Sequence, residues 1–254
     1  MARKNLFCIA LLSLTILSTE LFWTRLLSAE FYYTFAFLVL SLAVLGLGLG
    51  ALFLKMFPGT LKPKLLPVWL LLTGVMIISA VPAVFALHLD FTKLVSEPVN
   101  IFKLFAAIIF LGAGYFFGGM AIAHLFKSNP GDIPKLYMAD LIGASLGVIA
   151  FIVVMNSFGA SVTLICCAIL VLAASFIMAE KMVKLLPPIL LLGAAGYYIL
   201  IGGIPEQRRE ERAPVIFKHW DATAKIKVYE FDSTSRSINI DNAANTPMYG
   251  FDGK

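Results

Sequence analysis

The chain of 254 residues is 60% hydrophobic and only 14% charged, with a net charge of +5 and a mean hydropathy of +0.90. An ordinary soluble domain is about 45–50% apolar and about 25% charged, so this composition excludes a water-soluble globule. It also excludes a disordered chain, a disulfide-rich secreted scaffold and a nucleic-acid-binding protein. The composition therefore predicts an all-α polytopic membrane protein, whose first partner is the lipid bilayer.

Charge is distributed unevenly along the chain. Residues 1–203 hold twelve Lys and Arg against seven Asp and Glu, whereas residues 204–254 hold eight of each kind. The positive excess thus lies entirely in the apolar part, where such charges set the orientation of membrane spans. This division predicts a transmembrane domain over 1–203, a charged juxtamembrane linker over 204–213 and a soluble tail over 214–254.

Seven stretches of the first domain are long enough to be transmembrane helices, since about 20 apolar residues cross a hydrocarbon core roughly 30 Å thick. They cover 6–27, 32–54, 65–87, 101–126, 137–158, 161–179 and 185–203. The tightest connection, Asn156 to Gly159, separates the fifth span from the sixth. Because the connectors are short, consecutive spans are expected to be antiparallel neighbours in a seven-helix domain.

The charges of the connecting loops predict the orientation of the spans. With the N-terminus inside, nine Lys and Arg fall in inner loops and three in outer loops, which is the arrangement that membranes favour. The arginines of the linker would lie outside with the tail, so they reduce the excess of inner over outer positive charges. Seven crossings would then place the tail outside.

Glu20, Arg25 and Asp140 lie within the predicted spans, where an ionisable side chain is costly and needs a reason. Glu20 is either a proton- or cation-binding group or an interior carboxylate satisfied by a neighbouring helix. Arg25 follows Glu20 by five residues, or about 500° of helical turn, so the two side chains point apart and need not pair. We expect Arg25 to extend towards the membrane interface.

Asp140 is expected in the first turn of the fifth span, where a helix N-terminus stabilises an anion. Gly143 and Gly147 follow it, and Gly46 and Gly50 repeat the same spacing in the second span. Small residues four apart let two helices approach closely, whereas a phosphate-binding loop would have to follow a strand. These glycines therefore predict helix packing, and no metal-ligand spacing or cofactor motif is found.

In the tail, polar and apolar side chains alternate with a period of two residues. Residues 225–229 and 237–241 alternate polar and apolar side chains, with 233–236 as the turn between them, and this pattern indicates a β-hairpin. A further strand is expected over 215–220. An isolated hairpin is barely stable in water, so these strands need another domain, a second copy or the membrane part to pack on.

Several stretches of the chain resemble a known family. ELFWTRLLS, the Gly-rich spans and LYMADLIGASLG look like the membrane region of bacterial spermidine synthase-like proteins. FKHWDATAKIKVYEFD and SRSINIDNAANTPMYGFDG are similar to the small β-region that precedes the catalytic domain of polyamine aminopropyltransferases. The resemblance implies a multi-pass protein of the bacterial cytoplasmic membrane, related to a transferase.

The resemblance also implies substrate-binding residues in the tail. In that family a strand ending in Asp-Gly leads into a segment that lines the active site. Asp241 matches the Asp, Asn242 stands in place of the Gly, and Asn245 falls near a position where the soluble enzymes often carry a substrate-contacting Gln. The nucleotide-binding domain of the family would follow Lys254, so we expect no catalysis by this chain alone.

Three functions follow from these expectations. The first is a membrane module that anchors or partners an aminopropyltransferase-like domain, which either follows in the same protein or is supplied by a partner chain. The second is a small transporter or half-transporter in which Glu20 and Asp140 bind a cationic substrate such as a polyamine. The third is a structural subunit whose hairpin adds strands to a partner's sheet. An external tail conflicts with the cytosolic location of S-adenosylmethionine-type substrates, so the side of the tail is left open.

Overall fold

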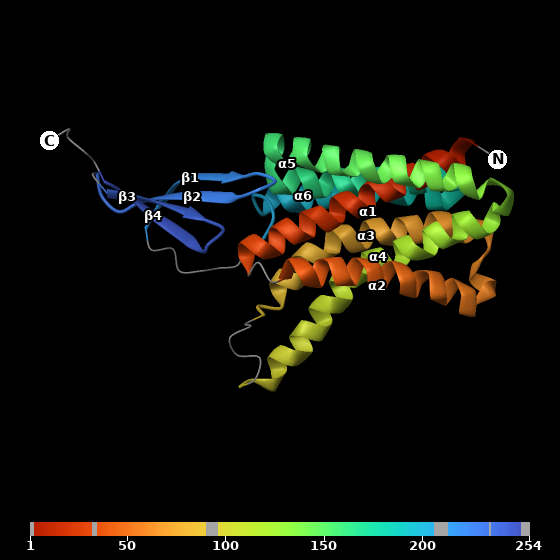
Figure 1. Ribbon diagram of the computed structural model, residues 1–254, viewed down its shortest axis with the longest axis horizontal. Helices are drawn as coiled ribbons and strands as arrows, with labels where there is room; N and C mark the ends of the chain where they lie inside the picture. Colours follow the sequence, from red (N-terminus) through yellow and green to blue (C-terminus); the bar gives the residue numbers. More distant parts are fainter. Residues whose placement is uncertain (1–2, 32–34, 90–95, 206–212, 234, 250–254) are drawn as a thin grey trace.

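The computed structural model describes residues 3–31, 35–89, 96–205, 213–233 and 235–249. A bundle of helices carries a small β-sheet at one end (Figure 1). The helices are α1 (Arg3–Glu30), α2 (Phe35–Met56), α3 (Leu66–Ala86), α4 (Pro98–Ser128), α5 (Ile133–Met178) and α6 (Leu186–Leu200), with short 3-10 helices η1 (Pro58–Thr60), η2 (Pro63–Leu65), η4 (Pro130–Asp132) and η5 (Lys181–Leu185) between them. Within the described ranges, six helices are long and apolar enough to cross a membrane.

Two of the seven predicted spans lie in the single long element α5. Gly159, near its middle, has a non-helical backbone with φ of 74° and ψ of −171°. Thr163 Oγ1 lies 3.5 Å from Met155 Sδ, eight residues earlier, whereas a straight helix would place such residues about 12 Å apart along its axis. The chain therefore turns back at Gly159, where the sequence predicted a tight turn.

The two parts of α5 run in opposite directions along the bundle. At its start the chain lies beside the N-terminus, since Asn5 Nδ2 donates a hydrogen bond of 3.2 Å to Asn129 Oδ1. Gly159 lies beside Trp220 of the sheet. Near the end of α5, Ser175 Oγ donates a 2.8 Å hydrogen bond to the Pro67 carbonyl, in the first turn of α3. The N-terminus and the sheet are at opposite ends of the bundle (Figure 1).

Glycines make the closest contacts between helices, as their spacing predicted. A Cβ added to Gly143 of α5 would lie 2.2 Å from the Ala10 carbonyl oxygen of α1, and one added to Gly50 of α2 would lie 2.1 Å from that of Phe116 in α4. Ser18 Oγ of α1 donates a 2.8 Å hydrogen bond to the Gly147 carbonyl. Only glycine allows backbones to approach this closely, so these positions fix the packing of α1 on α5 and of α2 on α4.

Large apolar side chains are exposed on the outer surfaces of the bundle. They include Leu45 of α2, Phe105 of α4, Ile149 of α5 and Leu192 of α6. In water such a surface would aggregate, whereas in a bilayer it contacts lipid tails. The distribution of exposed side chains thus agrees with the composition of the chain.

Four strands follow the helices: β1 (Val215–Trp220), β2 (Lys225–Glu230), β3 (Ser235–Ile240) and β4 (Ala244–Tyr249). They form one antiparallel sheet in chain order. β1 has the predicted bounds, but the predicted turn over 233–236 overlaps β3 because Arg236 already pairs with Glu230 across the two strands. β4 was not predicted. Residues 206–212 of the predicted linker lie outside the described part of the chain.

Candidate functional site

The sheet is joined to the bundle by two ion pairs at the end of α1. Arg25 pairs with Asp241 of the β3–β4 turn, and Glu30 pairs with Lys225 of β2. The side chains of Glu30 and Lys225 are each 1% exposed, and that of Arg25 is 9% exposed. The side chain of Asp241 is 27% exposed. Two positive and two negative side chains thus meet in a largely buried group, which we call the junction.

An aromatic ring covers the positive charges of the junction. Trp220, at the end of β1, is buried, and its ring centroid lies 4.9 Å from Lys225 Nζ and 6.0 Å from the Arg25 guanidinium carbon. Cations within about 6 Å of an indole ring are attracted to its face. Trp220 also contacts Gly159 where α5 turns back, so the junction touches both α1 and α5.

The β3–β4 turn brings Asp241 to the junction. Asp241 and Asn242 both have φ of 54°, and the Ala243 amide donates a 3.0 Å hydrogen bond to the Ile240 carbonyl. This is the geometry of a type I′ turn, in which Asp and Asn tolerate the left-handed backbone. Asn242 therefore adopts the left-handed conformation that a glycine would also adopt at this position. The Asp241-Asn242 dipeptide was thus a sequence signal for a hairpin turn.

Side chains of the turn make further contacts with the bundle and the sheet. Asp241 Oδ1 accepts a 2.7 Å hydrogen bond from the Lys225 backbone amide, and Asn242 Nδ2 donates one of 2.9 Å to the Ala29 carbonyl of α1. Asp241 Oδ1 thus accepts hydrogen bonds from both α1 and β2. Asn245 is exposed on β4, where its Oδ1 accepts a 2.8 Å hydrogen bond from Asn239.

Asp221 organises the β1–β2 turn beside the junction. Its Oδ1 accepts hydrogen bonds of 2.6 Å from the amides of Thr223 and Ala224 and of 2.7 Å from the Thr223 hydroxyl. Burial alone would raise the pKa of Asp221, but these hydrogen bonds outweigh it and lower the pKa below its ordinary value. The Ala222 amide donates to Asn156 Oδ1 of α5 at 2.8 Å, which ties this turn to the bundle.

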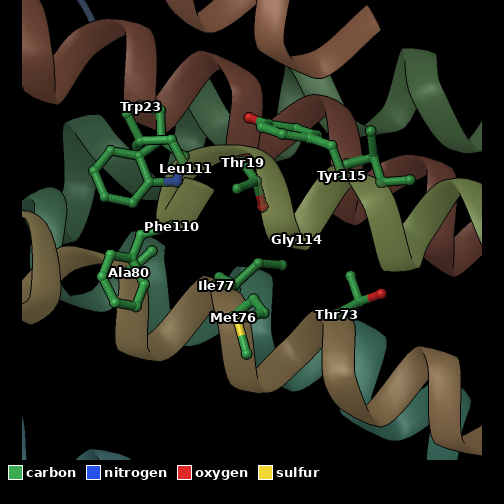
Figure 2. Close-up of a pocket in the computed structure, with 11 residues that line it drawn as sticks. Thr19, Trp23, Thr73, Met76, Ile77, Ala80, Phe110, Leu111, Gly114 and Tyr115 are labelled. Atoms are coloured by element: carbon green, nitrogen blue, oxygen red, sulfur yellow. The ribbon is translucent and has the colours of Figure 1, made fainter. Parts of the chain in front are cut away.

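Glu20 does not belong to the junction. It is half-buried on α1 and has no hydrogen-bond or ion-pair partner among the described residues. Its neighbour Thr19 lines a small cavity between α1, α3 and α4, shown in Figure 2. The Thr19 and Tyr115 hydroxyls are buried there without partners in the described part of the chain. The cavity volume of about 10 Å³ is that needed by a single water molecule.

Asp140 lies deeper in its helix than the sequence indicated. Because α5 begins at Ile133, Asp140 is about two turns from the helix start, and the expected first-turn position is wrong. Its Oδ1 accepts a hydrogen bond from Ser13 Oγ of α1. The carboxyl group is therefore satisfied by a neighbouring helix, next to the close contact at Gly143.

The fold defines the class of protein, a multi-pass helical protein by the length and apolar composition of its helices, with a small sheet docked at one end of the bundle. Comparison with known proteins found no family model, no curated protein and no solved structure that matches the chain. The resemblance to spermidine synthase-like proteins therefore stays a prediction. Within the described residues, no group of three or more His, Cys, Asp or Glu is placed to hold a metal ion.

Sequence reasoning missed three residues of the junction. Glu30 was placed beyond the first predicted span, Lys225 occupied a polar position of an alternating strand, and Trp220 ended a predicted strand without an assigned role. A charge at the end of a span and another in a strand carry no signal of mutual pairing. Only their approach in the folded chain identifies them.

Proposed function

We propose that the chain is the membrane module of a spermidine synthase-like protein, which holds a sheet at the membrane surface as a platform for an aminopropyltransferase-like domain. The observation that carries this proposal is the buried pair of Glu30 and Lys225. A loosely tethered tail would keep both charges in water, because burying an ion pair is costly unless its geometry is fixed. The junction thus holds the sheet in one orientation relative to the bundle.

A seven-span topology fits this role. The parts of α5 before and after Gly159 extend over roughly 39 Å and 28 Å at 1.5 Å per residue, so each has at least the length of the shorter transmembrane helices, which contain about 17 residues. The N-terminus and the sheet at opposite ends of the bundle require an odd number of crossings (Figure 1). With the basic N-terminal end inside, the sheet would lie outside, away from the cytosolic S-adenosylmethionine-type substrates, so a domain that uses these substrates requires the opposite orientation.

The outer face of the sheet supports the presence of a partner domain. By strand register, Phe217, Val228, Ile238 and Thr246 share one face, opposite to the face that holds Trp220 and Lys225. Phe217 is 53% exposed. An antiparallel sheet ordinarily turns its apolar face to a core and its polar face to water, so this apolar face is suited to packing against a domain.

Site-specific photo-crosslinking in intact cells tests the proposal. A photoreactive phenylalanine replaces Phe217 on the sheet, and the matched control carries it at Leu192, which is 75% exposed on α6. We expect position 217 to give an adduct with a chain, or a segment of the same polypeptide, that transfers an aminopropyl group to putrescine. Position 192 is expected to give lipid adducts alone.

Two other results would contradict the proposal in different ways. An adduct at position 217 with a protein that has no transferase activity would favour the structural subunit. A reporter fused to the tail shows on which side of the membrane the sheet lies. A transferase adduct together with a cytoplasmic reporter would support the role of the sheet as a platform but contradict the seven-span topology with the N-terminus inside. The absence of any protein adduct at position 217 would overturn the platform itself.

A transporter is a second candidate, and it is favoured by Glu20, which has no hydrogen-bond or ion-pair partner among the described residues and follows Thr19 of the small cavity in sequence. The volume of about 10 Å³ suits a water or a proton carrier better than an extended polyamine. Proteoliposomes containing the chain should then conduct protons, and Glu20→Gln should abolish the flux while Ser41→Ala, on the exposed side of α2, leaves it unchanged. Equal flux in wild type and Glu20→Gln would end this interpretation.

A further inference from the structure

A separate pocket lies at the end of the bundle that carries the N-terminus, far from the junction. It has a volume of about 570 Å³, within the range of small-molecule sites. His124, near the end of α4, lines it and is 2% exposed, yet its Nδ1 has no hydrogen-bond partner among the described residues. An unpaired buried nitrogen costs free energy, so it points to a group that the pocket is built to receive.

The wall of the pocket next to His124 is held in place by its own hydrogen bonds. Asn129 Nδ2 donates to the Leu125 carbonyl at 2.9 Å, and Asn129 Oδ1 accepts from Asn5 Nδ2 at 3.2 Å. These contacts join the end of α4 to the start of α1. The pocket is therefore organised before any ligand enters.

The lining of the pocket includes one basic and one acidic side chain, each close in sequence to a helix end. Lys64 lines it together with the first turn of α3, whose N-terminus has no side-chain cap, and both attract an anion. Glu180 lines it just after the end of α5, beside the end of α4, and helix C-termini together with a carboxylate attract a cation. Lys64 and Glu180 are exposed and have no ion-pair partner in the described part of the chain.

We propose that this pocket binds a phosphoethanolamine group, with its phosphate at Lys64 and the α3 N-terminus and its ammonium at Glu180 and the imidazole of His124. A neutral imidazole nitrogen accepts a hydrogen bond from an ammonium, which satisfies the buried Nδ1 or its ring partner. Leu66, Leu125 and Met178 also line the pocket and can contact the apolar part of the ligand. This proposal is independent of the function proposed for the sheet.

The same group is present in phosphatidylethanolamine and in soluble phosphoethanolamine, and the position of the pocket bears on the source. The N-terminal end of the bundle collects the basic residues that, by the loop-charge rule, lie at the level of the inner head groups. They are Arg3, Lys4, Lys62, Lys64, Lys127, Lys181 and Lys184. A lipid head group would reach the pocket from this surface.

Lipid retention by the purified full chain tests the site. The protein is extracted from nanodiscs that contain equal parts of phosphatidylethanolamine and phosphatidylglycerol, and native mass spectrometry measures which lipid it keeps. We expect a preference for phosphatidylethanolamine that falls about tenfold in His124→Phe, which keeps an aromatic ring but loses the nitrogen. Glu180→Gln should reduce the preference similarly, because only phosphatidylethanolamine carries the ammonium.

Variants on the exposed rim keep the test informative if His124→Phe does not fold. Lys64→Gln should weaken retention of both lipids, whereas Lys62→Gln, two residues away and outside the pocket lining, should change neither. A parallel titration with soluble phosphoethanolamine identifies the source of the ligand. If the soluble compound binds the wild type and this binding is lost in Glu180→Gln, the ligand is the free compound. If the soluble compound does not bind but the lipid is retained, the ligand is the lipid. Equal retention of both lipids by the wild type, or no effect of Glu180→Gln in either arm, would overturn the site.

Discussion

α1 makes two contacts of different physical character, one inside the bundle and one at the sheet. Along the bundle it meets α5 through glycines, where backbone atoms at Ala10 and Gly143 leave no room for a side chain. At the sheet it ends in Arg25 and Glu30, which pair with charges of the tail. Within a bilayer, lipid tails make apolar contacts as readily as another helix does, so the shapes of the helix surfaces decide which helices associate. Where a helix leaves the bilayer, paired charges can define its orientation relative to another domain.

The largest expected effect concerns the buried pair at the junction. Lys225→Met removes the positive charge that pairs with the buried Glu30 carboxylate, and loss of one member of a buried pair costs about 3–5 kcal/mol. We expect the sheet to detach from the bundle, which limited proteolysis and Trp220 fluorescence would report. Adding Glu30→Gln to Lys225→Met should recover part of the loss.

A matched control uses an ion pair of the same sheet that is open to water. Arg236 and Glu230 pair at 2.7 Å with side chains 49% and 36% exposed. Arg236→Met should therefore cost at most about 1 kcal/mol. Equal losses from Arg236→Met and Lys225→Met would mean that burial does not distinguish the junction from an ordinary surface pair.

The next effect concerns the contact between α1 and α5. Gly143→Ala places a methyl group 2.2 Å from the Ala10 carbonyl oxygen, so the helices must separate. Overpacking of this kind costs about 1–3 kcal/mol, measurable by reversible unfolding in mixed micelles. Gly48→Ala on α2 is the control, since an added Cβ there meets nothing within 4 Å. Helix propensity alone would make both substitutions stabilising, so a gain of stability in Gly143→Ala equal to that in Gly48→Ala would contradict the close contact.

The glycine contacts and most of the fold were open to prediction because their causes are local. Apolar length predicts a span, and Gly143 and Gly147 predict a close approach without reference to the partner. The tight turn at Asn156 to Gly159 was likewise predicted, and the chain reverses at Gly159. What composition could not show was which helix each glycine would meet.

The junction could not be predicted, for a physical reason. Glu30 and Lys225 are 195 residues apart, and neither has a neighbour in sequence that marks it as buried. Lys225 fits the solvent side of an amphipathic strand, which is the usual place for a lysine. Arg25 was expected to extend to the interface, but it is 9% exposed and pairs with Asp241, a partner that follows only from the docking of the sheet.

A smaller effect is expected from the hydrogen bond between Ser13 and Asp140. Ser13→Ala removes a donor between α1 and α5 inside the bundle, where such bonds average about 0.6 kcal/mol and reach about 1.7 kcal/mol. Ser41→Ala removes a hydroxyl that bonds only within its own helix, to the Phe37 carbonyl at 2.9 Å, and should be close to neutral. The same unfolding measurement compares them, and a larger loss at Ser41 would contradict the interhelical contact.

The smallest effect is a pH dependence confined to the sheet. The pKa of Asp221 is lowered in the folded chain by hydrogen bonds from Thr223 and Ala224, from an ordinary value of 3.8. A lowered folded-state pKa adds stability that is fully present above the unfolded pKa and is lost as the pH falls through the folded pKa. We therefore expect the sheet to weaken below about pH 3.8, seen as a change in Trp220 fluorescence. Asp221→Asn should remove the contribution of this group to the acid transition and leave the glycine contacts of the bundle unaffected. An acid transition of unchanged size in Asp221→Asn would contradict this prediction and show that Asp221 is not the group responsible.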